Sequence, residues 1–334
     1  FAPRALHRVL DAKLMARVAT KPFAAETSKG PRQFPRGTII VPFDRQATAR
    51  EEIHDLMRTI AAEDGVPVHA LMSGRSTVST AGINVGGPST HAIELPKVLL
   101  VVGDDINLYD AGEVWHLADY RMQMPITLRD RDSLGSIDWD RYTHIVFPSG
   151  KYEKHKPKYA KRLRQWIDEG GTAIGMREAA PWLRSMTLDW VDPEDDQDAD
   201  AEETEDEETE EQKRLSYIDK DSYEAARVIG GAIFSADLDV THPMGFGFSD
   251  RDIFLHKNVE EPLEATENPF GTVIAYTDDP LFSGYASDEN IEALAGTPSL
   301  IAERSGDGSI ILFADNPNFR GYWYGTNKLF LNAI

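Results

Sequence analysis

The sequence predicts an α/β fold with a doubly wound, mostly parallel sheet. Two patterns favour this class. Short apolar runs, such as residues 97–103, have the uninterrupted hydrophobicity of strands that are buried on both faces of a parallel sheet. Segments with helical periodicity alternate with these runs, which is the order of elements in doubly wound sheets. Hydrophobic residues make up 41% of the 334 residues, enough for a sizeable core.

Residues 1–95 are predicted to form a smaller linking segment with one strand–helix–strand unit. Residues 38–42 are an apolar run typical of a buried strand. Thr48 and Glu51 have the spacing of a capping box, and the apolar positions that follow repeat as on an amphipathic helix. Residues 66–71 are predicted as the next strand. The stretch 73–91 is rich in Ser, Gly and Thr and is predicted to be a loop or linker.

Residues 96–334 are predicted to form the larger α/β domain. One helix is expected to begin at Asp110, as a capping box with Glu113, and another at Pro157. A final helix is expected to begin near Thr326. The predicted strands cover residues 97–103, 125–128, 144–148, 172–176, 231–235, 272–276, 299–303 and 309–314.

An acidic insertion interrupts this domain at about residues 190–214. Fourteen of the twenty residues from Asp192 to Glu211 are acidic and none is basic. Without them, 35 basic and 42 acidic residues remain, so the net charge changes from −21 to −7. A block of like charges repels itself and cannot bury apolar surface, so we expect a disordered, solvated loop. Cation binding or partner docking is the alternative.

Composition excludes several classes of function. The acidic balance argues against nucleic acid and anionic membranes as partners, and no apolar run is long enough to span a membrane. The chain has no cysteine, which excludes disulfides, thiolate metal sites and cysteine nucleophiles. Dinucleotide-binding glycine motifs, phosphate-binding loops and serine-hydrolase elbows are also absent from the sequence.

A polar ligand site is predicted at the carboxyl ends of the strands, because ligands bind there in open parallel sheets. The side chains that follow these strands include amides, a carboxylate and cations. Ordinary loop polarity and helix caps are the alternative explanation. The ligand-binding candidates are Asn107, Lys151, Tyr152, Glu178, Asn316, Asn318 and Arg320.

Four residues are candidates for catalysis: Glu113, His116, Arg177 and His242. If they converge on a concave pocket, a hydrolase that works without cysteine becomes possible. If they are scattered or occupied in helix caps, the hydrolase hypothesis fails. Glu113 with His116, and His91 with Glu94, have metal-ligand spacing, but each pair lacks further ligands, so no metal site is predicted.

Three consecutive aromatic residues, Tyr322, Trp323 and Tyr324, offer a third possibility. Exposed, coplanar rings could stack on a sugar, which would make the domain a carbohydrate-binding module. Buried rings would instead pack beneath the final helix.

From residue 97 onward, the order of elements resembles a class I glutamine amidotransferase-like domain. In that family a nucleophilic cysteine follows the strand that comes after a helix ending in Gly-Gly. Here the corresponding residues are Gly175, Met176, Arg177 and Glu178, and the cysteine is absent. The resemblance therefore implies the fold without the glutaminase mechanism. His242 and Pro243 are similar to a His-Pro pair of some relatives, but without a nucleophile that histidine has nothing to activate.

A second resemblance covers nearly the whole chain. Residues 109–116, 239–243, 314–321 and 323–332 are similar to the region that follows the peptidase domain in large bacterial zinc carboxypeptidases of the carboxypeptidase A type. This resemblance implies a non-catalytic accessory region, a peptidase domain of the same polypeptide as its partner, and a periplasmic or extracellular location. It places zinc in that peptidase domain and no cofactor in this chain. A start at Phe1 rather than Met agrees with a piece of a longer polypeptide.

Overall fold

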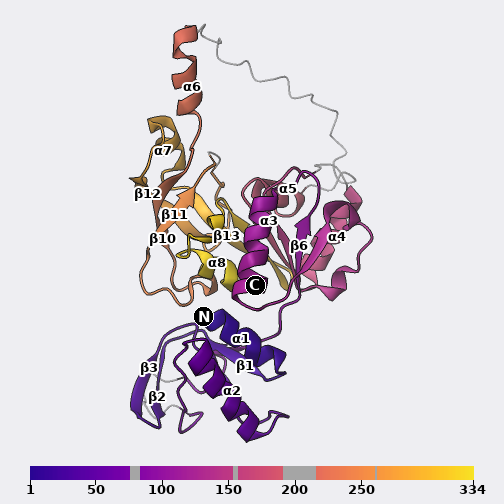
Figure 1. Cartoon of the computed structure of the whole chain (residues 1–334), viewed down its shortest axis with the longest axis vertical. Helices are drawn as coiled ribbons and strands as arrows, with labels where there is room; N and C mark the ends of the chain where they lie inside the picture. Colours follow the sequence, from indigo (N-terminus) through magenta and orange to yellow (C-terminus); the bar gives the residue numbers. More distant parts are fainter. Residues whose placement is uncertain (76–82, 153–156, 191–215, 260–261) are drawn as a thin grey trace.

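The computed structural model describes residues 1–75, 83–152, 157–190, 216–259 and 262–334 (Figure 1). The predicted acidic insertion lies almost entirely outside these residues. A larger α/β body contains the central sheet, and a smaller segment at the amino terminus lies at one end of it (Figure 1).

The central sheet has nine strands in the order β11-β10-β12-β13-β14-β9-β8-β6-β7. The five strands from β14 to β7 are parallel to one another, which confirms the predicted α/β class. These are β6 (Val98–Val102), β7 (Thr127–Asp130), β8 (His144–Phe147), β9 (Thr172–Met176) and β14 (Gly308–Phe313).

The other four strands extend the sheet as an antiparallel wing. They are β10 (Ala232–Leu238), β11 (Asp252–Lys257), β12 (Thr272–Ser283) and β13 (Pro298–Ser305). The direction of the chain alternates from β14 to β13, β12 and β10. The carboxyl end of β10 therefore lies at the edge of the sheet where the parallel strands begin.

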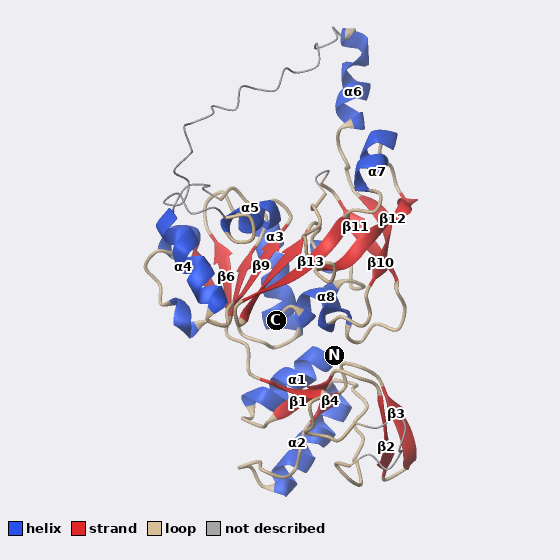
Figure 2. Cartoon of the chain, turned by 180° about the vertical axis from the view of Figure 1, so that it is seen from behind, coloured by secondary structure: helices blue, strands red, loops and turns tan. Residues whose placement is uncertain are grey.

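Helices cover both faces of the sheet, as a doubly wound fold requires (Figure 2). One face packs against α3 (Leu108–Trp115), α7 (Asp288–Leu294) and α8 (Asn327–Asn332), around buried residues such as Val114 and Phe330. The other face packs against α4 (Pro157–Asp168) and α5 (Ala179–Met186), around Leu163 and Leu183. The short helix α6 (Lys220–Ala226) follows the undescribed segment.

The amino-terminal segment differs in part from the prediction. It consists of α1 (Ala2–Asp11), α2 (Arg50–Glu63), the sheet β4-β1-β5 and the hairpin β2-β3. The strand bounds are β1 (Ala16–Ala19), β2 (Phe23–Thr27), β3 (Gly30–Phe34), β4 (Ile39–Ile40) and β5 (Thr90–Ile93). The order β4, α2, β5 preserves a strand–helix–strand unit, but β1 lies between the two strands and is antiparallel to both. Residues 66–71 contribute only one bridge, from Leu71 to Thr27.

Neither predicted capping box forms. The residue before α2 is Ala49, and no side chain caps that helix. Helix α3 begins at Leu108, and its cap is Asn107, whose side chain accepts hydrogen bonds from the backbone N–H groups of Tyr109 and Asp110 at 3.0 and 3.4 Å. Because the helix starts earlier than predicted, Asp110 and Glu113 lie within its first two turns, where their carboxyl groups can contact other loops.

Candidate functional site

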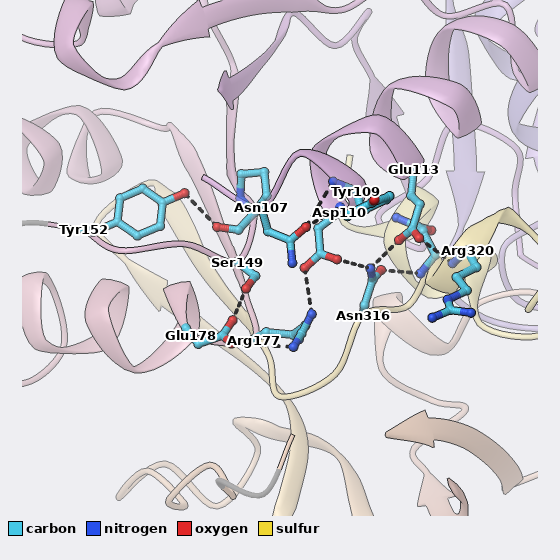
Figure 3. Close-up of polar contacts among 12 residues, drawn as sticks. Asn107, Tyr109, Asp110, Glu113, Ser149, Tyr152, Arg177, Glu178, Asn316 and Arg320 are labelled. Atoms are coloured by element: carbon cyan, nitrogen blue, oxygen red, sulfur yellow. Dashed lines mark hydrogen bonds and ion pairs between the residues drawn. The ribbon is translucent and has the colours of Figure 1, made fainter. Parts of the chain in front are cut away.

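The carboxyl ends of β6, β8, β9 and β14 meet at one edge of the sheet, and polar side chains follow each of them. Asn107 follows β6, Ser149 follows β8, Arg177 follows β9 and Asn316 follows β14 (Figure 3). This edge is where open α/β sheets place their ligands. Parallel pairing of these strands therefore assembles residues that are up to about two hundred positions apart in the sequence.

The turn from β9 into α5 is the sharpest feature of this edge. Arg177 has a φ of +52°, which is unusual for a residue with a side chain. Its backbone N–H donates to the Phe313 carbonyl at 2.8 Å, and its own carbonyl accepts from Ala180 at 2.8 Å. A strained residue between a strand and a helix is the geometry of a nucleophile elbow. Arg177 is one of the four residues, Gly175 to Glu178, that the sequence resemblance matched to the nucleophile position.

A buried ion pair holds the Arg177 side chain. One guanidinium nitrogen lies 3.2 Å from Asp110 Oδ2, and a second lies 3.5 Å from Glu178 Oε1. The side chains of Arg177 and Asp110 are only 11% and 5% exposed. Burial raises the pKa of Asp110, while the charge of Arg177 and the amide of Asn316 act in the opposite direction. Arg177 Nε is also buried, with no hydrogen-bond partner among the described residues.

Asn316 joins two carboxyl groups of α3. Its amide nitrogen donates to Asp110 Oδ1 at 3.1 Å and to Glu113 Oε2 at 2.5 Å (Figure 3). Its amide oxygen accepts from the backbone N–H of Asn318 at 2.8 Å, which fixes the orientation of the amide. The result is one continuous chain of contacts from Arg177 to Asp110, Asn316 and Glu113.

Glu113 is the most perturbed carboxyl group at this edge. Burial raises its pKa to about 7, and the nearby charge of Asp110 adds to the shift. Hydrogen bonds from Asn316 and from the backbone N–H of Arg320, at 2.6 Å, only partly offset the effect of burial. Arg320 has a φ of +48°, and this conformation turns its N–H toward Glu113. Near neutral pH Glu113 can therefore gain or lose a proton.

The other ligand-binding candidates have internal roles or point to solvent. Asn107 caps α3, and the Tyr152 hydroxyl donates to the Pro148 carbonyl at 2.7 Å. Glu178 accepts a hydrogen bond from Ser149. Lys151 is exposed, and its carbonyl accepts from Arg131.

Asn318 is almost completely buried rather than displayed in a crevice. Its side-chain oxygen accepts from Asn327 at 3.0 Å, which ties the last loop to α8.

The four catalytic candidates do not converge. His116 stacks on Tyr120, with ring centroids 5.1 Å apart. His242 follows β10, so it lies at the opposite edge of the sheet, where its Nδ1 accepts from the Met244 N–H at 3.2 Å. The hydrolase alternative required all four groups to converge, and His242 does not join the others, because β10 is antiparallel to the strands that carry the elbow. Of the four, Glu113 and Arg177 belong to one network, in which Asn316 and Asp110 connect them.

Sequence reasoning missed a second polar cluster behind this edge. Lys257 is completely buried, and its Nζ lies 3.1 Å from Asp315 Oδ1. Asp315 also accepts hydrogen bonds from the hydroxyl groups of Tyr276 and Ser299. The sequence contains a pattern that could have indicated this cluster. Ile253, Leu255 and Lys257 alternate along β11, so all three side chains lie on its buried face.

Among the described residues, no group of three or more His, Asp or Glu side chains is arranged to hold a metal ion. No helix in the described ranges is long and apolar enough to cross a membrane.

Comparison with known proteins gives only distant structural likeness. No protein-family model matches the chain, and no curated protein matches it. A solved structure described as ThuA-like, from Bacteroides uniformis, is 11% identical; the match covers 74% of this chain and 94% of that one, with a TM-score of 0.43. A β-galactosidase from Bacillus circulans and an exo-β-1,4-mannosidase from an Opitutaceae bacterium are 12% and 11% identical, with TM-scores of 0.33. The match covers 71% of this chain in both cases, but only 30% and 35% of those enzymes. With TM-scores below 0.5, these likenesses add nothing about function.

Proposed function

We propose that this chain is a non-catalytic, amidotransferase-like accessory region of a zinc metallocarboxypeptidase, as the sequence resemblance implies. Its role is to pack against the peptidase domain of the same polypeptide, in the periplasm or outside the cell. One observation carries the non-catalytic part of this proposal. The elbow of the fold holds Arg177, and a buried carboxylate fixes that side chain.

The chemistry of the elbow supports the proposal. An arginine side chain stays protonated in proteins and cannot act as a nucleophile. Two acids of this network, Asp110 and Glu113, already accept hydrogen bonds from Asn316. A general base for a hydrolase would have to be within hydrogen-bond reach of a reacting group. His242, the histidine that the family resemblance suggested, lies at the other edge of the sheet.

The decisive experiment is made on the full polypeptide that includes this chain. We expect its upstream region to encode a peptidase domain, and the purified protein to bind one zinc ion and release carboxy-terminal residues from peptides. This chain, expressed alone, should bind the separately expressed peptidase domain. An upstream reading frame without a peptidase domain, or two fragments that do not associate, would contradict the proposal.

A separate assay tests the absence of catalysis. The chain alone should hydrolyse neither glutamine nor simple esters. The variant Arg177→Cys introduces a thiol at the elbow and should remain inactive, because His242 lies at the opposite edge of the sheet. Measurable glutaminase activity in the unmodified chain would favour the hydrolase hypothesis instead.

A second candidate function is the binding of a small polar ligand or sugar at the elbow edge. Half-buried Glu113 favours it, together with the exposed rings of Tyr109 and Tyr322, which are 85% and 55% exposed. The three-ring platform that a sugar-binding module requires is not present as a unit. Trp323 is partly buried and donates to the Phe254 carbonyl at 3.3 Å, and Arg121 covers Tyr324 at 4.2 Å.

Titration with mono- and disaccharides, followed by intrinsic fluorescence, tests this second candidate. Binding that weakens in Tyr322→Ala and Tyr109→Ala, but not in the control Tyr217→Ala, would support it. Tyr217 suits the control because it is 86% exposed and lies before α6, away from the elbow. If the intrinsic fluorescence does not change during the titration, these sugars are excluded as ligands.

A further inference from the structure

A cavity of about 280 Å³ lies at the other end of the parallel strands, where β6, β7 and β8 begin. Three cationic side chains line it: Lys97, Arg129 and Arg141. Lys97 precedes β6, Arg129 is in β7, and Arg141 belongs to the turn that leads into β8. In Figure 1, β6 starts directly after the connection from the amino-terminal segment, so this cavity is far from the elbow edge.

The register of the sheet explains why these residues face one another. Thr127 and Arg129 pair with Leu99 and Val101 of β6, so they point to the same side of the sheet as those two residues. Leu99 and Val101 pack into the core that includes Trp139. The turn that carries Arg141 therefore lies on the side to which Arg129 points.

The backbone around the cavity is fixed. The Lys97 N–H donates to Thr143 Oγ1 at 2.8 Å, and its carbonyl accepts from the Thr143 N–H at 2.9 Å. Two proline rings, those of Pro96 and Pro125, form rigid parts of the wall. The backbone that carries Lys97 is thus held in place, while Lys97, Arg129 and Arg141 are all exposed to solvent.

The three cations have no anionic partner within the described chain. Neither Lys97, Arg129 nor Arg141 makes an ion pair or a side-chain hydrogen bond among the described residues. This is unexpected in a chain with 56 acidic and 35 basic residues. The neighbouring Arg131, by contrast, contacts Asp105 and Asp132. Like charges around one cavity repel each other, and a bound anion would remove that repulsion.

We propose that this cavity binds a small organic ligand through a phosphate-type dianionic group. Arginine forks match the oxygens of a phosphate in pairs, while the lysine adds a compact charge and Thr127 a hydroxyl donor. The cavity has more room than a bare phosphate needs, and Pro96 and Pro125 line it beside the cations, where the organic part would lie. This site is independent of the accessory role proposed above.

Isothermal titration of the full chain at low ionic strength tests the proposal, with inorganic phosphate and phenyl phosphate as probes. Phenyl phosphate should bind more tightly than inorganic phosphate, because its ring also contacts Pro96 and Pro125. The double variant Arg129→Gln/Arg141→Gln should lower the affinity at least about tenfold, since each lost charged hydrogen bond costs that much. Lys97→Gln should give a smaller loss.

The matched control is Lys161→Gln/Arg304→Gln, which removes the same charge from two exposed positions elsewhere. It should bind both probes like the unmodified chain. Three results would overturn the proposal: no binding at millimolar phosphate, equal weakening in the control, or equal affinity for the monoanion benzoate. Circular dichroism checks that the double variant is folded. If it is unfolded, the smaller loss of affinity expected for Lys97→Gln tests the proposal instead.

Discussion

At the scale of single residues, the structure depends on charges that are buried in pairs. Lys257 is the clearest case, because a completely buried ammonium group is rare unless it has a partner. Asp315 supplies the opposite charge and also accepts from two hydroxyl groups. Burial and the charge of Asp315 raise the pKa of Tyr276 well above its usual value, so the tyrosine stays neutral and donates.

Removing one partner of this pair should therefore lower the stability of the fold. We expect Lys257→Met to lower the free energy of unfolding by about 3–5 kcal/mol, because Asp315 is left as an unpaired buried charge. The double variant Lys257→Met/Asp315→Asn should recover much of this loss. Urea denaturation measures both effects, and the exposed Lys161→Met serves as the control. A loss below about 1 kcal/mol for the single variant would mean that the pair is not buried as described.

Glu113 should make stability depend on pH. Its pKa is about 7 in the folded chain and near 4.5 when unfolded, so the folded state holds more protons between these values. Stability is therefore expected to fall as pH rises from about 4.5 to 7. Between pH 5 and pH 8, the free energy of unfolding of Glu113→Gln should rise by on the order of 1 kcal/mol relative to that of the unmodified chain. This figure is already reduced for solvent screening.

Thermal melts across this pH range, compared with the exposed control Glu51→Gln, measure the effect. If the unmodified chain and Glu113→Gln lose stability in parallel as pH rises, then Glu113 is an ordinary carboxylate.

At the scale of elements, β9 and α5 pack closely against each other. A Cβ atom on Gly175 would lie 3.0 Å from the Ala179 carbonyl oxygen and 3.1 Å from Ala180 Cα. These are backbone atoms, which cannot move without shifting the helix. Gly175 therefore lets α5 approach the strand closely enough to form the elbow.

We expect Gly175→Ala to cost about 1–3 kcal/mol of stability, as overpacking typically does. The control is Gly135→Ala, because a Cβ atom there meets nothing within 4 Å. Chemical denaturation should separate the two variants clearly. Equal stability of the two would show that α5 can move away from β9 at little cost.

The sequence was sufficient to predict the parallel strands and also β10, β12 and β13 of the antiparallel wing, but not β11 or the hairpin β2-β3. Strands β6, β8 and β9 are buried on both faces, and continuous apolar runs identify them. Strand β11 includes charged residues at both ends, and the hairpin β2-β3 has few β-branched residues, so neither has a strong local signal. They form by pairing with the strand next to them in the chain, β11 with β10 and β2 with β3.

The candidate site was predictable to the level of strand ends only. The topology of parallel sheets correctly brought Arg177 and Asn316 together. The role of Asp110 was missed because it was expected to cap α3, and a helix that starts earlier turns its side chain toward Arg177. Periodicity locates a helix to within a few residues, which is too coarse to predict which side chains meet.

At the scale of the whole molecule, separate hydrophobic cores suggest two cooperative units, as the boundary predicted at residue 95 implies. Ile53 and Ile60 pack in a core of the amino-terminal segment. Phe234 and Leu163 belong to the cores on the two faces of the large sheet.

We expect calorimetry of the full chain to show two unfolding transitions. Ile53→Ala should lower the temperature of one transition and Phe234→Ala that of the other, because each core loses about 2–5 kcal/mol without affecting its neighbour. A single transition, shifted by both variants, would instead mean that the two parts unfold as one unit.

The pairing of β14 with β9 has a consequence for how the chain could be divided. β9 lies before the undescribed segment and β14 after it, yet the two strands are adjacent over five residue pairs, from Ser309 with Thr172 to Phe313 with Met176. A polypeptide opened between Trp190 and Ser216 would leave two fragments that share one sheet and both cores. Neither fragment would contain a complete sheet, so the two should associate. Their association would re-form the hydrogen bond from Asn316 in the second fragment to Asp110 in the first, which suits the protein to use as a split reporter.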